Sequence, residues 1–481
     1  MKDAGLNFDN SWVRDLPGTF VELAPDAAPD PRLLVLNDAL AEALGLDPAV
    51  LAAHPEWFAG GDLPEGARSV ALAYAGHQFG GFSAQLGDGR AHLLGEHVAP
   101  DGRRWDLQLK GSGRTPFSRG GDGKAAVGPM LREYLISEAM AALGVPSTRS
   151  LAVATTGETI RREAGLLPGA VVARVAASHI RVGSFQFWAA REDVAQLAAL
   201  ADYAIARHDP DLIGREDHVV AFLDRVIGRQ CRLIAQWMGL GFVHGVMNTD
   251  NMAVSGETID YGPCAFMEGY APGTVFSSID RNGRYAYANQ PLILGWNLAR
   301  LAEALVPLIP GEGEAVVADL NARLSGIAGR YRAEWEVVMR RKLGLAGEEP
   351  ADGALADDLL SAMTGADWTL TFHRLADAAE GDETGLRGLF EDFAAIEAWL
   401  PRWRARLDKG SAARMRGVNP VVIPRNHKVE EALAAAEAGD LGPFQALLAQ
   451  VTRPFGAERG REAYVLPAPK GFGDYVTFCG T

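Results

Sequence analysis

The chain has 481 residues, of which 48% are hydrophobic and 22% charged, and its formal net charge at pH 7 is −15. This length suits two to four structural units, or one large two-lobed enzyme with extensions. The negative charge argues against binding to nucleic acid or to an anionic membrane. No run of about 18 apolar residues predicts a membrane span.

The ends of the chain and its cysteines indicate the compartment. The N-terminus has neither the apolar stretch of a signal peptide nor the composition of a transit peptide. The three cysteines, Cys231, Cys264 and Cys479, are too few for a secreted disulfide scaffold and do not have metal-ligand spacing. We therefore expect a cytoplasmic protein, in which one cysteine pair could form.

Residues 1–65 are predicted to form an N-terminal extension. Within it, the stretch 31–46 (PRLLVLNDALAEALGL) has the apolar spacing of a helix and a glycine near its end. The glycines and prolines of residues 58–68 then predict a loop at the boundary of the extension.

Residues 66–190 are predicted to form a β-rich lobe with one inserted helix. A turn at Gly87–Gly89 separates two potential strands, and residues 103–110 alternate apolar and polar side chains with a period of two, which is typical of a strand. Residues 129–143 have the pattern of an amphipathic helix, with a proline at the start and a glycine after the end. Strand character returns between residues 150 and 183.

Residues 191–310 are predicted to form a second lobe, mostly helical over 192–240 and then a loop over 241–290 that is rich in Gly, Asn and Asp. Residues 311–481 are predicted to be a helical C-terminal extension. The fold class is therefore α+β, and the order of the parts is typical of a two-lobed, protein-kinase-like fold.

Lys110 and Glu133 fit the pair with which kinases hold phosphate. The lysine ends a predicted strand and the glutamate lies on the helix that follows, where it can orient the lysine. Glu138, five residues further on, points to another face of that helix. A surface lysine and two solvated glutamates are the simpler alternative for these residues taken alone.

Two glycine-rich segments are candidates for anion binding. QLGDGR contains Gly87, Gly89 and Arg90, and GSGRTPFSRGGDGKAAVGP contains Asp122 and Gly123 among basic residues before a helix. Backbone N–H groups at a helix N-terminus favour an anion. A plain hairpin turn and a flexible linker are the respective alternatives.

Arg174 and Arg181 lie in an otherwise apolar segment, ARVAASHIRVGSF. Two arginines are costly to bury unless each is paired with an anion. Their partner is either an internal polyphosphate or the carboxylates of structural ion pairs, and both alternatives stay open.

The loop FVHGVMNTDN and the following TIDYGP resemble a kinase catalytic loop and its metal-binding turn. Asn251 and Asp260 are nine residues apart and would supply hard oxygen ligands to a divalent cation. The position of the kinase base, five residues before the asparagine, is Val246, and Asp250 is the only carboxylate in the loop. His244 is interpreted as packing the loop.

These motifs are similar to those of the selenoprotein O family of kinase-like protein adenylyltransferases. The similar stretches include AYAGHQFGGFSAQLGDGRAHLLGE, LQLKGSGRTPFSRGGDGKAAVGPMLREYLISEAM, RVAASHIRVGSFQ, HGVMNTDNMAV and TIDYGPCAFM, and the N-terminal NFDNSWVRDLP and C-terminal TFCGT also fit. The resemblance covers nearly the whole chain.

The resemblance implies an enzyme that binds ATP in a flipped orientation and transfers AMP to Ser, Thr or Tyr hydroxyls of proteins. It implies that Asp250 is the base, that Asn251 and Asp260 hold Mg²⁺ or Mn²⁺, and that Lys110, paired with Glu133, contacts phosphate. Further nucleotide-binding residues carried over from the family are Gly87, Gly89, Arg90, Asp122, Gly123, Arg174, Arg181 and Asp260.

The family also has a regulatory disulfide between a tail cysteine and a cysteine of the activation segment. In this chain the tail cysteine is Cys479, and Cys264, four residues after Asp260, is the best substitute for its partner. A redox partner would then act through Cys479. Two free thiols are the alternative, since a disulfide needs Cα atoms within about 7 Å of each other.

Three other functions were weighed against adenylyl transfer. Val246 in place of the base argues against an ordinary kinase, and the set Lys110, Glu133, Asn251 and Asp260 argues against a silent nucleotide-binding pseudokinase. UMP transfer from UTP with Mn²⁺ cannot be ranked against AMP transfer from the sequence.

Overall fold

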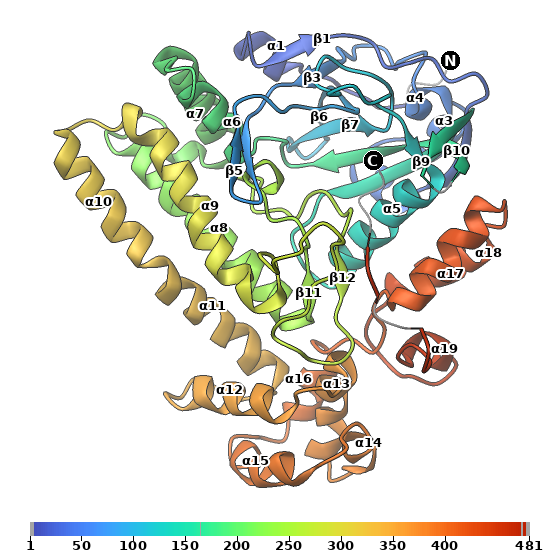
Figure 1. The fold of residues 1–481 in the computed structure, drawn as a ribbon, viewed down its shortest axis with the longest axis vertical. Helices are drawn as coiled ribbons and strands as arrows, with labels where there is room; N and C mark the ends of the chain where they lie inside the picture. Colours follow the sequence, from blue (N-terminus) through green and yellow to red (C-terminus); the bar gives the residue numbers. More distant parts are fainter. Residues whose placement is uncertain (1–3, 164, 473–474, 478–481) are drawn as a thin grey trace.

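The computed structural model of the chain describes residues 4–163, 165–472 and 475–477. In these residues the central feature is an eight-stranded antiparallel sheet with the order β1-β3-β6-β7-β10-β9-β2, in which β8 also pairs with β10 (Figure 1). Its strands are β1 Phe20–Glu22, β2 Arg32–Leu36, β3 Val70–Leu72, β6 Ala91–Val98, β7 Arg104–Lys110, β8 Ala125–Ala126, β9 Arg149–Arg162 and β10 Gly165–Ala176.

Two small antiparallel pairs lie outside that sheet. They are β4 Gly76–Gln78 with β5 Gly81–Ser83, and β11 Phe242–Val243 with β12 Ala265–Phe266. The first pair is a hairpin that extends from the sheet toward the helices (Figure 1). The second pair joins the two ends of the loop that follows the long helix α8.

Helices surround the sheet and form the rest of the molecule. Those before residue 241 are α1 Ser11–Asp15, α2 Asp38–Ala43, α3 Pro48–Ala52, α4 Glu56–Ala59, α5 Val127–Ala142, α6 Val182–Ala189, α7 Val194–His208 and α8 His218–Leu240. Those after it are α9 Gln290–Leu305, α10 Gly313–Ser325, α11 Ile327–Lys342, α12 Asp352–Ala362, α13 Trp368–Ala379, α14 Thr384–Arg387, α15 Ala394–Arg404, α16 Ser411–Arg416, α17 Asn426–Glu437, α18 Gly442–Val451 and α19 Glu462–Val465. Short 3₁₀ turns are η1 Pro210–Leu212, η2 Thr249–Asn251, η3 Tyr287–Asn289 and η4 Val306–Leu308.

The prediction of a mixed α and β protein is confirmed, as are the strand over 103–110, the helix near 129–143 and the helical character of residues 192–240 and of the C-terminal part. In Figure 1 the helices α12–α16 gather at the end of the molecule opposite the sheet. The two-lobed, kinase-like description and the boundaries at residues 65, 190 and 310 stay an interpretation.

The expected helix over residues 31–46 was wrong in its first part. Residues Arg32–Leu36 form β2 and pair with β9, and the helix α2 begins only at Asp38. Asn37 starts this helix as its N-cap, because its side chain accepts a hydrogen bond from Leu40 N at 3.1 Å. A short apolar run is ambiguous between helix and strand, and the long-range partner β9 decided it.

The turn expected at Gly87–Gly89 does not join two paired strands. β5 pairs with β4, whereas β6 pairs with β3 and β7, so residues 84–90 form a crossing loop. The ring of Phe117 packs against Gly87, where a Cβ atom would lie 2.5 Å from the ring. The Gly87 φ of 130° also lies in the region that favours glycine.

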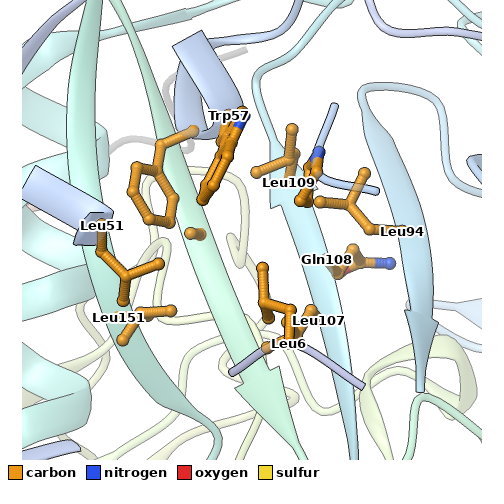
Figure 2. A pocket seen from close by; sticks show the side chains of 11 residues that line it. Leu6, Leu51, Trp57, Leu94, Leu107, Gln108, Leu109 and Leu151 are labelled. Carbon is orange, nitrogen blue, oxygen red and sulfur yellow. The ribbon is translucent and has the colours of Figure 1, made fainter. Parts of the chain in front are cut away.

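The side chains on the two faces of β7 point toward different parts of the molecule. Leu107 and Leu109 point toward the N-terminal segment, where they line an apolar cavity together with Leu51 and Trp57 (Figure 2). Because side chains alternate along a strand, Lys110 points the other way, toward α5 and the loop region. No helix in the described ranges combines the length and the apolar composition that crossing a bilayer requires.

Candidate active site

Three cations converge on the carboxylate of Asp260. Lys110 Nζ lies 2.6 Å and Arg174 Nη2 2.7 Å from Asp260 Oδ1, and Arg181 Nη1 lies 2.9 Å from Oδ2. Desolvation by burial would raise the pKa of Asp260, but these cations hold it well below its usual range. The side chain is 21% exposed, whereas those of Lys110 and the two arginines are at most 9% exposed, so Asp260 is the member that a ligand can reach.

The backbone at Asp260 turns the carboxylate into this cluster. Its φ is +65°, in the left-handed region that a non-glycine residue seldom adopts. Aspartate tolerates this conformation better than most residues, and such outliers concentrate at functional sites.

Glu133 of α5 joins two of the three cations. Its Oε2 lies 2.7 Å from Lys110 Nζ, and its Oε1 accepts a hydrogen bond from Arg174 Nε at 2.8 Å. Desolvation acts to raise the pKa of Glu133, but Arg174 and Lys110 lower it on balance. The structure therefore brings Lys110 and Glu133 together, while Glu138 instead pairs with Arg149.

Arg174 and Arg181 are paired with carboxylates. Beyond its contact with Asp260, Arg181 donates to the backbone carbonyl of Asp250 at 2.7 Å and stacks over the Tyr74 ring at 4.7 Å. Each guanidinium is almost fully buried. The ion-pair alternative describes these contacts, and a role at a polyphosphate stays a prediction.

Asp250 lies in η2 and has a different environment. Its Oδ2 accepts one hydrogen bond, from Gln78 Nε2 at 3.0 Å, while Oδ1 is buried and has no hydrogen-bond partner in the described parts of the chain. Gly76 is close enough that a Cβ there would lie 2.8 Å from Oδ1. Burial raises the pKa of Asp250 to about 6. This carboxylate thus has a lone pair available to accept a proton near neutral pH.

Asn251 is held by its amide nitrogen, which donates to the Val246 carbonyl at 3.1 Å. This bond leaves the side-chain oxygen available to a ligand. The side chain of Val246 is buried, so no acid occupies the position of a kinase base.

The donor types at Asn251 and Asp260, an amide oxygen and a carboxylate, suit a divalent cation, and their binding one together with a nucleotide stays a prediction. Within the described residues no group of three His, Cys, Asp or Glu side chains could hold a metal ion by itself. Mg²⁺, however, is usually held by one or two protein oxygens together with substrate phosphates and water. One amide oxygen and the partly exposed Asp260 carboxylate match that donor set.

The glycine-rich segments border the end of β7, and Asp88 of the first segment approaches Arg181 of the Asp260 cluster. Arg90 O accepts a hydrogen bond from Gly111 N at 2.7 Å, beside Lys110. A Cβ on Gly89 would lie 2.8 Å from Phe117 O, and one on Gly123 would lie 2.0 Å from Gly113 O, so both positions require glycine. Asp122 pairs with Arg162 at 2.8 Å on the surface. Contacts of these residues with a nucleotide stay predictions.

Sequence reasoning missed Asp88 and Gln78. Asp88 is buried, accepts a hydrogen bond from Gln108 at 3.0 Å, and lies 3.7 Å from Arg181. Between two glycines it had the appearance of an exposed turn residue. Gln78 contacts Asp250 across 172 residues of sequence, and only its place in a glycine-rich stretch could have drawn attention to it.

The segment after Asp260 is covered by the C-terminal part of the chain. Arg132 of α5 donates to the carbonyls of Gly262 and Cys264 and, at 3.0 Å, to the hydroxyl of Tyr475. Thr477 Oγ1 donates to Pro263 O at 2.7 Å. Cys264 is buried, and Cys479 lies outside the described residues, so the predicted pairing of the two stays a prediction.

A small cavity lies behind the loop. It is lined by Asn251, Glu257, Asn248 and Asn297 and by apolar residues of α8. Burial raises the pKa of Glu257 to about 7, and the carboxylate accepts hydrogen bonds from Ala177 N and Ser255 Oγ, each at 3.0 Å.

The comparisons with known proteins agree with one another. Residues 3–452 match the family model described as protein adenylyltransferase SelO. A protein nucleotidyltransferase YdiU of Cereibacter sphaeroides (strain KD131) is 61% identical over 480 residues, which are 99% of this chain and all of the relative. The proteins of the same description from Methylorubrum populi and Mycobacterium sp. (strain KMS) are 55% and 54% identical, each with at least 98% of both chains covered.

Proposed function

The chain belongs to the SelO family of protein adenylyltransferases and is thus a protein nucleotidyltransferase, and we propose that it transfers AMP from ATP to Ser, Thr or Tyr hydroxyls of proteins. The observation that carries this proposal is the placement of Lys110, Arg174 and Arg181 around Asp260, next to Asp250, with a valine where a kinase has its base. The three cations are suited to neutralising phosphate charge. Asp250 can accept a proton from a position that differs from that of the kinase base.

The proposed reaction is a single displacement at the α-phosphorus. The acceptor hydroxyl oxygen forms a bond to this phosphorus, the bond from phosphorus to the bridging oxygen breaks, and pyrophosphate leaves with the electron pair. Asp250, whose Oδ1 has no hydrogen-bond partner among the described residues, accepts the hydroxyl proton. Gln78 fixes the other oxygen of the carboxylate and so sets its orientation.

The cations supply the electrostatic part of catalysis. Lys110, Arg174 and Arg181 are held in place by Glu133 and Asp260 before any nucleotide arrives, so little reorganisation is needed when phosphate charge develops. When bound by Asn251 and Asp260, Mg²⁺ or Mn²⁺ would neutralise further phosphate charge. The glycine-bearing segments at Gly87–Arg90 and Asp122–Gly123 would form the walls of the nucleotide pocket.

The choice of ATP over UTP as the nucleotide donor is the most specific part of the proposal. The description of the family supports ATP as the donor, while the relatives are described only as nucleotidyltransferases. UMP transfer from UTP with Mn²⁺ is the competing donor chemistry, and we propose AMP because the family description names adenylyl transfer.

Position-specific labels test this proposal. The protein is incubated with a mixture of candidate acceptor proteins and with ATP labelled at the α- or the γ-phosphate, or UTP labelled at the α-phosphate, in Mg²⁺ or Mn²⁺. Retention of the α-label of ATP on protein is the expected result. Retention of the γ-label would make the enzyme a kinase, and preferential retention of the UTP label would replace the proposed donor.

A further inference from the structure

The hairpin β4–β5 lies directly on the loop that contains Asp250. His77 N donates to Thr249 Oγ1 at 2.7 Å, Gln78 Nε2 to Asp250 Oδ2 at 3.0 Å, and Phe79 N to Asn248 Oδ1 at 3.1 Å. Three consecutive hairpin residues therefore contact three consecutive loop residues. Any group that approaches Asp250 from this side also meets the tip of the hairpin.

The tip carries two phenylalanines that solvent can reach. Phe79 is 36% and Phe82 47% exposed. The turn joining the strands has Phe79 and Gly80 at its centre, with φ of +52° and +86°. Two positive φ values are what a type I′ hairpin turn requires, and Asn-Gly is its preferred sequence. A bulky aromatic residue at the first position is strained there, although the Phe79 ring also packs against the Tyr285 ring, with 5.1 Å between the centroids.

The aromatic side chains of the hairpin contact helix α9 through His77. The His77 ring contacts the Phe82 ring at 4.9 Å and the Trp296 ring at 5.0 Å between centroids. Leu292, one helical turn before Trp296 and therefore on the same face, is 71% exposed. We call the set Phe79, Phe82, Arg284, Leu292 and Trp296 the hairpin–helix surface.

Arg284 gives this surface a positive charge in a protein whose net charge is −15. Its guanidinium stacks 4.8 Å from the centroid of Trp296 and lies beside Gly80 at the hairpin tip. In the described parts of the chain it forms no ion pair with a carboxylate. A ligand that covers the aromatic rings can therefore supply the carboxylate.

We propose that the hairpin–helix surface docks the acceptor protein, through a segment with an apolar side chain beside the acceptor hydroxyl and a carboxylate nearby. The inference rests on the proposed function, which requires an acceptor hydroxyl at Asp250. The triphosphate is better suited to the Asp260 cluster, where three cations gather, than to this surface, where Arg284 is the one cation of the set. Exposed aromatic and arginine side chains are also typical anchors of protein interfaces.

The test uses the full-length protein and a synthetic peptide array. Each peptide has one central Ser, Thr or Tyr and one fixed flanking residue, and transfer of α-labelled AMP is measured. The parent is expected to prefer peptides with an apolar residue next to the acceptor and an acidic residue close by. Equal labelling of all peptides would overturn the proposal.

The key variant is Phe79→Asn, because asparagine suits the turn while the aromatic ring is lost. We expect the melting temperature to be unchanged or higher, the KM for the preferred peptide to rise about tenfold, and the KM for ATP to stay constant. Arg284→Glu is expected to reverse the preference for an acidic residue. Ile213→Asn, which replaces a side chain that is 63% exposed outside this surface, is the matched control and should behave as the parent.

The remaining outcomes separate the two proposals. If the parent labels peptides and Phe79→Asn has the parental KM, the docking proposal fails and the proposed function stands. If the parent transfers no α-label to any peptide or protein, both fail. If sedimentation shows a dimer of the parent that Phe79→Asn dissociates, the surface binds a second copy of the chain and the docking proposal is wrong.

Discussion

Asp260 and Asp250 are two carboxylates of one site, and their environments differ in almost every respect. Asp260 contacts three cations, which hold its pKa well below the usual range against the effect of burial. Among the described residues, the Asp250 side chain accepts one hydrogen bond, from a neutral amide, and its buried Oδ1 has no partner; burial raises its pKa to about 6. Neighbouring acids whose pKa values are pushed apart are typical of sites that divide catalytic roles. The comparison favours binding of cations by Asp260 and acceptance of a proton by Asp250, and both roles stay predictions.

Replacing Asp260 should have the largest effect. In Asp260→Ala, Lys110, Arg174 and Arg181 lose a shared anion and the cation site loses its carboxylate. We expect transfer of α-label to fall at least about 1,000-fold and metal-dependent nucleotide binding to be lost, as measured by labelling and by calorimetry with ATP and Mn²⁺. Activity within tenfold of the parent would remove Asp260 from the site.

The second prediction concerns the proton acceptor. Asp250→Asn keeps the shape of the side chain and removes its basicity, so we expect kcat to fall by about 10²–10⁴. The affinity for ATP should stay within about twofold of the parental value, because the hydrogen bond that joins Asp250 to the cation cluster is accepted by its backbone carbonyl. A parental kcat, or a loss confined to ATP affinity, would contradict the division of roles.

Glu257 is a half-buried acid that lines the cavity behind the loop, and it tests how burial acts on a carboxyl group in this protein. Burial raises the pKa of Glu257 in the folded protein to about 7 from its ordinary value of 4.5. Between these values the folded state holds a proton that the unfolded state has lost, so stability should fall as the pH rises from about 4.5 to 7. In Glu257→Gln this part of the pH dependence should disappear, with a gain of up to about 3 kcal/mol in the free energy of unfolding at pH 8. Urea unfolding of both proteins at pH 5 and pH 8 measures the difference. Equal differences at the two pH values would show that Glu257 is ionised throughout.

Local sequence patterns predict the site residues that lie on regular strands and helices. The alternation over residues 103–110 and the amphipathic pattern of 129–143 predicted the strand and the helix that carry Lys110 and Glu133. The structure places those two side chains 2.7 Å apart at Nζ and Oε2. Their contact follows from the standard packing of a helix on the strand before it, which motif spacing captures.

The rest depends on partners that are distant in the sequence. The run at Arg32–Leu36 becomes a strand because β9 is available, and residues 84–90 become a crossing loop because β5 pairs with β4. Gln78 reaches Asp250, and Asp88 approaches Arg181, only after the sheet has formed. Local periodicity contains no information on such contacts, so the polar residues beside the cluster could not be ranked from the sequence.

The smallest expected effect tests how tightly Asp250 is held. Gly76→Ala would place a Cβ 2.8 Å from Asp250 Oδ1, close enough that the carboxylate or the hairpin must move. We expect kcat to fall about tenfold, because a small misplacement of a catalytic group is enough for such a loss, while the KM for ATP changes little. Gly81→Ala is the matched control in the same hairpin, since the nearest contact of its Cβ would be an ordinary 3.5 Å from Gln78 O. If both variants retain the parental kcat, the orientation of Asp250 does not depend on the hairpin. If both lose activity equally, the loss comes from the hairpin backbone as a whole and not from the contact of residue 76 with the carboxylate.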